Sequence, residues 1–151
     1  MPKILMTSVR DEEQAAIKEF AVENYVEIIT TEKLIDDAVD LTKDVDGLVI
    51  QQRSKLPTSI YAKLRENGLK QIATRTAGFD MIDLAEAQAN NLTVTNVPAY
   101  SPRSVAEHAL MQIFRVLRKA YRFDAQVAAN DYRWFSDEQA MEIHTATIGI
   151  I

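Results

Sequence analysis

The stretch KILMTSVRDEEQAAIKEFAVEN, residues 3–24, joins a short apolar run to an amphipathic helical pattern. Residues 3–9 are apolar enough for a buried strand. After them, Ala16, Ile17, Phe20 and Ala21 recur on one face at helical spacing. A strand followed by such a helix is one βα unit, which is the repeating piece of a parallel sheet.

The same alternation continues along the chain as far as residue 97. It predicts strands at residues 26–30, 47–51, 71–76 and 92–97, and helices at residues 32–41, 59–66 and 83–90. Parallel strands that are joined through helices form right-handed crossovers. The sequence therefore predicts an α/β fold with a doubly wound parallel sheet of five strands.

Charge and composition argue against several classes of function. The net charge of −5 disfavours binding to nucleic acid, and the absence of cysteine removes disulfides and thiolate metal sites. No apolar stretch approaches the roughly 18 residues that span a bilayer. Because Met1 leads directly into a strand rather than a signal peptide, we expect a cytoplasmic protein that has no membrane partner.

The residues that follow the strands are expected to line a ligand crevice, because parallel strands open toward a ligand at their carboxyl ends. Many of them donate hydrogen bonds: Ser8, Arg10, Gln51, Gln52, Arg53, Arg75 and Thr76. Gly78 either permits a tight turn whose N–H groups bind an anion or is a plain turn residue. Arg75 either attracts a carboxylate or forms an ion pair inside the domain.

Two classes of protein with a similar sheet are disfavoured. A phosphoacceptor receiver domain needs an aspartate after the third strand and a lysine after the fifth, where this chain has Gln51 and Tyr100. An FMN-binding flavodoxin needs backbone donors after the first strand, where this chain has the acidic sequence VRDEE.

A long helical pattern follows the prolines of VPAYSPRSVAEHALMQIF, residues 97–114. Ser101 as N-cap and Pro102 at the first helical position begin a helix, which the apolar spacing extends from residue 105 to about residue 129. This helix is apolar on most sides, so we expect it to bridge to a second sheet or a twin subunit. HTATIGII, residues 144–151, then predicts the first strand of a second sheet.

Three segments together resemble the D-isomer-specific 2-hydroxyacid dehydrogenase family: ATRTAGFDMIDL (73–84), VTNVPAYSPRSVAEHAL (94–110) and ATIGII (146–151). The segment around Tyr100 is most similar to the D-lactate dehydrogenases of lactic acid bacteria. The resemblance covers essentially the whole chain. It implies a flavodoxin-like catalytic, substrate-binding domain at residues 1–100. Residues 101–151 would then be a long interdomain helix and the start of an incomplete, NAD-binding Rossmann domain.

The resemblance also implies a function, the reversible reduction of pyruvate to D-lactate with NAD by a homodimer. The amides of Ala77 and Gly78 would bind the carboxylate of the 2-oxo acid. Tyr100 would reach the substrate with its hydroxyl and would lie, with Val105, at the nicotinamide. The catalytic arginine, histidine and glutamate of the family have no counterpart in this chain, so no catalytic residue is assigned and the chain alone is expected to be inactive.

Two alternatives to this function stay open at the level of sequence. One is a dehydrogenase of the D-2-hydroxyisocaproate type, and the other is a non-catalytic flavodoxin-like module for binding or dimerisation.

We expect several further side chains to have structural roles. His108 and His144 are expected to be structural, and Asp80 and Asp83 to serve in a turn and a helix cap rather than a metal site. Trp134 is either a pocket wall or a packing anchor.

Overall fold

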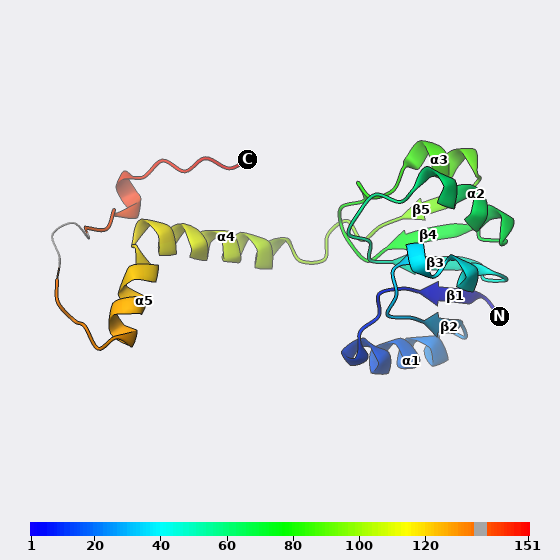
Figure 1. Ribbon diagram of the computed structural model, residues 1–151, viewed down its shortest axis with the longest axis horizontal. Helices are drawn as coiled ribbons and strands as arrows, with labels where there is room; N and C mark the ends of the chain where they lie inside the picture. Colours follow the sequence, from blue (N-terminus) through cyan, green and yellow to red (C-terminus); the bar gives the residue numbers. More distant parts are fainter. Residues whose placement is uncertain (135–138) are drawn as a thin grey trace. The chain divides into compact units, whose positions relative to one another are not determined.

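The computed structural model describes residues 1–134 and 139–151, and it divides into two compact units, Met1–Tyr100 and Ser101–Ile151 (Figure 1). The first unit contains a sheet and three α-helices. Its elements are β1 (Lys3–Met6), α1 (Gln14–Glu23), β2 (Glu27–Thr30), β3 (Gly47–Ile50), α2 (Thr58–Glu66), β4 (Gln71–Thr74), α3 (Leu84–Ala89) and β5 (Thr93–Thr95).

The sheet confirms the predicted fold class. All neighbouring strands are parallel, and their order is β2-β1-β3-β4-β5. The chain moves from β1 outward to β2 on one side and through β3 and β4 to β5 on the other. With right-handed crossovers, α1 therefore covers one face of the sheet, and α2 and α3 cover the opposite face. Figure 1 shows α1 beside β2, and α2 and α3 beside β4 and β5.

The core lies between the sheet and the helices α2 and α3. Alternate residues of the strands point into it, such as Leu48 and Ile50 from β3 and Ile72 from β4. Removal of each such side chain from water contributes about 1.5–3 kcal/mol. Tyr61 of α2 is fully buried among them, and its hydroxyl accepts a hydrogen bond of 2.7 Å from the N–H of Asp83. This bond fixes the start of α3.

Helix α1 is covered less than its sequence pattern predicts. None of its ten residues is fully buried, and Phe20, which the pattern places on the apolar face, is 53% exposed. On the same face of the sheet, Gln71, Thr93 and Thr95 are exposed and Ala73 is half-buried. Within the described residues, α1 therefore covers only part of this face.

The helix predicted at residues 32–41 does not form. Two short 3-10 turns replace it, Ile35–Asp37 and Val39–Thr42, and between them Ala38 has a φ of −131°, outside the helical region. A side chain from another part of the sequence holds this shape, because Asn67 Nδ2 donates to Val39 O at 3.2 Å and to Thr42 Oγ1 at 2.8 Å.

The described part of the second unit contains two α-helices, α4 (Pro102–Leu117) and α5 (Ala120–Ala128), where the sequence predicted one long helix. The break is at Lys119, whose φ of 50° is left-handed. An ion pair of 2.8 Å between Arg115 Nη2 and Asp124 Oδ2 links the two helices across the break.

The strand predicted at residues 144–151 is also wrong. Ile143–Thr145 forms a 3-10 turn, and residues 146–151 belong to no strand. A strand is stabilised by pairing with a neighbour, and no segment in the described ranges pairs with these residues. The described helices also include none that is long and apolar enough to cross a membrane.

Candidate functional site

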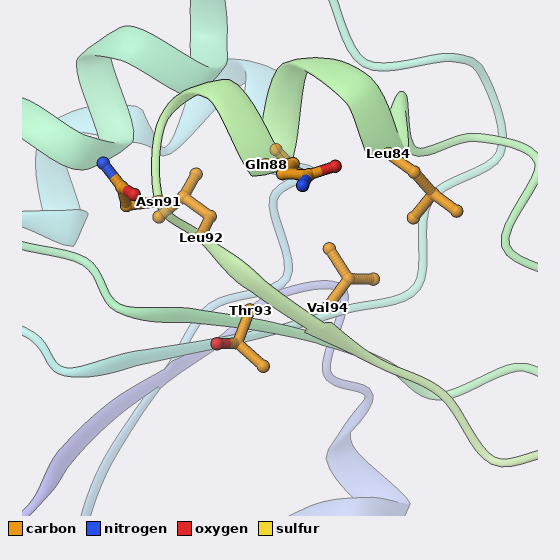
Figure 2. Close-up of a pocket in the computed structure, with 7 residues that line it drawn as sticks. Leu84, Gln88, Asn91, Leu92, Thr93 and Val94 are labelled. Carbon is orange, nitrogen blue, oxygen red and sulfur yellow. The ribbon is translucent and has the colours of Figure 1, made fainter.

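Two hollows in the first unit differ in their chemistry. One lies between α3 and β5, has a volume of about 430 Å³, and is lined by Leu84, Ala87, Gln88, Asn91, Leu92, Thr93 and Val94. Figure 2 shows its close-up, with Leu84 and Gln88 on the helix above Val94 of the strand. Its lining contains no lysine or arginine, and it reaches the amino end of β5 rather than the carboxyl end. It is therefore poorly suited to a carboxylate.

The second hollow lies where the crevice was predicted, at the carboxyl ends of the strands. This strand-end cleft has a volume of about 700 Å³ and is lined by Ser8, Val9, Arg10, Asp11, Glu12, Glu32, Leu34, Gln51, Gln52, Arg53 and Thr76. These residues follow β1, β2, β3 and β4. Only Val9 and Leu34 are apolar, so the cleft is suited to a small polar molecule.

The loop after β4 exposes two backbone donors beside this cleft. Its carbonyls are occupied, because Asn96 Nδ2 donates to Ala77 O at 2.7 Å and Thr76 Oγ1 donates to Gly78 O at 2.7 Å. Within residues 1–134 and 139–151, the N–H groups of Ala77 and Gly78 have no acceptor. Both residues are exposed, so the two N–H groups are accessible to an anion.

Gly78 is not needed for the shape of this loop. Its φ is not positive, and a Cβ atom added to it would meet Asp80 Oδ2 at 3.5 Å, an ordinary contact. The predicted reason for a glycine here, a tight turn that only glycine adopts, is therefore not what the backbone shows.

Arg75 is engaged inside the domain, which decides between its two predicted roles. Its Nη1 contacts Glu13 Oε1 at 2.7 Å, and its Nη2 donates to the carbonyls of Thr7 at 3.2 Å and Ser8 at 2.7 Å. The side chain is only 16% exposed. Arg75 therefore fastens the segment after β1 to the end of β4, and both segments border the cleft.

The pKa of Glu13 reflects this arrangement. The N–H of Arg10 donates to Glu13 Oε2 at 2.9 Å and, together with the positive charges of Arg75 and Arg10, lowers the pKa of Glu13 below its usual 4.5. A carboxyl group whose pKa is lower in the folded state stabilises the fold above its unfolded pKa. This contribution is lost as the pH falls below about 4.5 through the folded-state pKa.

We expect Glu13→Gln to lower the free energy of unfolding by about 1 kcal/mol at pH 7, because a charged partner of Arg75 is replaced by a neutral one. At pH 3, below the usual pKa of 4.5, the difference from the parent chain should shrink, because the stabilisation by the Glu13 carboxylate is lost as the pH falls. Urea unfolding at both pH values measures it. Glu12→Gln is the control, because Glu12 pairs with Arg10 on the open surface. An equal loss for Glu13→Gln at both pH values would contradict the assignment.

The other predicted binding residues fall in different units. Tyr100 is the last residue of the first unit and is 66% exposed. The chain just before it is held to the loop after β4, because the N–H of Val97 donates to Thr76 O at 3.2 Å. Val105 is an exposed residue of α4 in the second unit. The roles of Tyr100 and Val105 at a substrate or cofactor stay predictions.

Both histidines lie in the second unit. His108 is exposed and its Nε2 lies 3.3 Å from Gln112 Nε2, while His144 is exposed and its Nδ1 lies 3.1 Å from Glu142 Oε2. Trp134 is exposed, and its two possible roles stay predictions.

The aspartate expected to cap a helix does so. Asp83 Oδ1 accepts hydrogen bonds from the N–H groups of Ala85 at 3.0 Å and Glu86 at 3.1 Å, at the start of α3. In the part of the chain that the structure describes, no group of three or more His, Cys, Asp or Glu residues could hold a metal ion.

Sequence reasoning missed the partner that orients Gln52. Gln52 is only 5% exposed, and its Nε2 donates to Asp36 Oδ2 at 2.8 Å. Asp36 belongs to the segment that was predicted to be a helix, and no local pattern marks it as a neighbour of β3. Only the folded chain brings Asp36 to Gln52.

The residues present do not form a dinucleotide phosphate site. Such a site needs a glycine-rich turn between a strand and a helix. The chain has four glycines, and Gly149 is the only one in the second unit. No strand or helix in the described ranges adjoins it. What this chain offers is a polar cleft with accessible backbone donors.

Comparison with known proteins places these features in context. Residues 4–149 match the family model described as D-isomer specific 2-hydroxyacid dehydrogenase, catalytic domain. The chain is 37% identical over 152 aligned positions to a D-lactate dehydrogenase of Staphylococcus aureus, and the match covers 100% of this chain and 46% of that protein.

Solved structures agree with this match. A D-lactate dehydrogenase from Sporolactobacillus sp. is 48% identical with a TM-score of 0.68, and the match covers 95% of this chain and 43% of that one. A D-lactate dehydrogenase from Aquifex aeolicus, solved in complex with NAD and lactic acid, is 28% identical with a TM-score of 0.81, and the match covers 92% and 41%. The chain spans less than half the length of each of these relatives.

Proposed function

Because the chain belongs to the D-isomer specific 2-hydroxyacid dehydrogenase family, we propose that it carries the substrate-binding part of an NAD-dependent enzyme that reversibly reduces pyruvate to D-lactate. The observation that carries this proposal is the pair of N–H groups of Ala77 and Gly78, which lack an acceptor among the described residues beside the strand-end cleft. A carboxylate that accepts both bonds would be held by its charged end, with the rest of the molecule in the cleft.

The contribution of this chain is to bind and orient the oxo acid. Its described residues offer no cradle for a pyrophosphate, so we propose that the cofactor is held mainly by other parts of the protein. Tyr100 follows the segment that is hydrogen-bonded to the loop after β4, and its exposed hydroxyl is available to a substrate oxygen.

The lining of the cleft favours a short substrate over a branched apolar one. A dehydrogenase of the D-2-hydroxyisocaproate type must bury a four-carbon apolar side chain, and that burial requires apolar walls. Only two of the eleven residues that line the strand-end cleft are apolar. We therefore prefer pyruvate to the longer oxo acid.

Helix α4 supports a homodimer. Val105, Leu110, Met111, Phe114 and Val116 are all exposed on it, and exposed apolar side chains gathered on one helix are typical of an interface. A second copy of the chain is the partner that we propose for this surface.

Tyr100→Phe tests the proposed substrate contact. In the protein expressed in full from its gene, we expect kcat/KM for pyruvate to fall five- to thirty-fold, or about 1–2 kcal/mol, because a substrate oxygen loses its hydrogen-bond donor. The melting temperature should barely change, since the ring is retained. Steady-state kinetics and thermal unfolding measure both quantities.

Tyr132→Phe is the matched control, because Tyr132 is an exposed tyrosine of the second unit. It should leave kcat/KM unchanged. If Tyr100→Phe kept the kcat/KM of the parent protein while Tyr100→Ala lowered its melting temperature, Tyr100 would be a packing residue and its role in substrate binding would be refuted.

A further inference from the structure

We propose that Arg75 and its partner Glu13 are positioning residues for the substrate. They hold the N–H groups of Ala77 and Gly78 at a fixed distance from the opposite wall of the strand-end cleft. This inference rests on the proposed function, because it takes the carboxylate of the oxo acid to bind those two N–H groups. It goes further by naming the side chains that set the geometry of binding from beneath, through the backbone that they hold.

Arg75 bridges two sides of the cleft across an intervening strand. It directly follows β4, and its guanidinium donates to the carbonyls of Thr7 and Ser8, which directly follow β1. Because β3 lies between β1 and β4 in the sheet, the bridge spans two strand spacings, or about 10 Å. The segments after β1 and β4 are therefore joined directly, past the end of β3.

Each end of this bridge adjoins a residue of the cleft. Ser8 lines the cleft on the side of β1, and Thr76, the residue after Arg75, lines it on the side of β4. Ala77 and Gly78, which carry the two accessible N–H groups, come directly after Thr76. A change in the bridge would therefore change the gap between these donors and the wall after β1.

The wall after β1 depends on outside support at Ser8. Its φ of 55° lies in the left-handed region, which a residue with a side chain rarely adopts and which persists only when surrounding contacts hold it. The N–H of Ser8 donates to Lys33 O at 3.0 Å, and its carbonyl accepts from Arg75 Nη2 at 2.7 Å. Loss of the second contact would let this part of the wall relax.

Glu13 fixes the direction of the guanidinium. Its Oε1 contacts Arg75 Nη1 at 2.7 Å, and its Oε2 accepts from the N–H of Arg10 at 2.9 Å. The side chains of Arg75 and Glu13 are only 16% and 24% exposed, so salt and water screen this pair less than an ion pair on the open surface. Because Glu13 already neutralises its charge, Arg75 is suited to hold the cleft in shape rather than to attract a carboxylate.

Arg75→Lys in the protein expressed in full from its gene tests this role. Lysine keeps the positive charge, but its ammonium cannot serve all three acceptors that the planar guanidinium reaches. We expect KM for pyruvate, and the inhibition constant of the unreactive pyruvate analogue oxamate, to rise about tenfold. The values of kcat and of KM for NADH should change by roughly twofold at most, because the variant weakens only the hold on the carboxylate.

Glu13→Gln separates positioning from attraction by charge. A glutamine side chain has one acceptor oxygen, so it cannot serve both Arg75 and the N–H of Arg10 as Glu13 does. The positioning role therefore predicts that KM for pyruvate and the inhibition constant of oxamate rise, by about threefold. Attraction by charge predicts that both fall, because Arg75 would lose its counter-ion and draw the carboxylate more strongly.

Lys70→Met is the matched control. Lys70 Nζ pairs with Asp46 Oδ1 at 2.6 Å, and the two residues directly precede β4 and β3, at the opposite edge of the sheet from the cleft. This variant should leave all of these constants unchanged. A loss of stability alone lowers the amount of folded enzyme, and hence the apparent kcat, without changing KM.

Several outcomes would overturn the positioning role. They are a parental KM for pyruvate in Arg75→Lys, a fall of that KM in Glu13→Gln, and a rise of KM for NADH as large as the rise for pyruvate. In each case the parent protein still reduces pyruvate, so the proposed function stands. A parent protein that does not reduce pyruvate with NADH would refute the proposed function and this inference together.

Discussion

Tyr61→Ala is expected to lower the free energy of unfolding of the first unit by about 4 kcal/mol. Tyr61 is fully buried in the core with Leu64 and Ile72, so its removal leaves a cavity that the rigid sheet cannot close. The N–H of Asp83 also loses its acceptor at 2.7 Å. Since a domain of this size is stable by only about 5–15 kcal/mol, this loss should remove much of its stability.

Tyr61→Phe separates the two contributions. It keeps the ring and removes only the hydroxyl, so we expect a loss of about 1–2 kcal/mol from the unpaired N–H of Asp83. Urea unfolding followed by far-ultraviolet circular dichroism measures both variants. Tryptophan emission is unsuitable, because the only tryptophan, Trp134, lies in the second unit. A loss below 1 kcal/mol for Tyr61→Ala would contradict the described core.

The 151-residue chain alone is expected to show no dehydrogenase turnover and no measurable binding of NADH. It has no glycine-rich loop to cradle a pyrophosphate in its described part, and it carries no residue to which a catalytic role is assigned. Calorimetric titration with NADH and an absorbance assay with pyruvate measure the two properties.

The D-lactate dehydrogenase of Aquifex aeolicus, which was solved with NAD, is the positive control for this titration. Saturable binding of NADH by the chain at one site with micromolar affinity would refute the prediction. It would also mean that the second unit forms a phosphate site without a glycine-rich loop that marks it in the sequence.

The architecture of the first unit was predictable because it depends on local patterns. A short apolar run marks β3, and helical patterns between the strands mark α2 and α3, so element type and order follow from the sequence. The failures have a different origin. The turns at Ile35–Asp37 and Val39–Thr42 are held by the distant Asn67, and α5 is tied to α4 by the pair Arg115–Asp124. No glycine or proline marks the break at Lys119.

The location of the candidate site also follows from the sequence, since parallel strands bring their carboxyl ends to one edge. The state of each donor there was decided only by tertiary structure. The guanidinium of Arg75 is paired with Glu13 and two backbone carbonyls. The side-chain amide of Gln52 is oriented by its hydrogen bond to Asp36, and the N–H groups of Ala77 and Gly78 are left accessible. Hydrogen-bond partners come from segments far apart in the chain, and the strand order that unites them is a property of the folded sheet rather than of any local pattern.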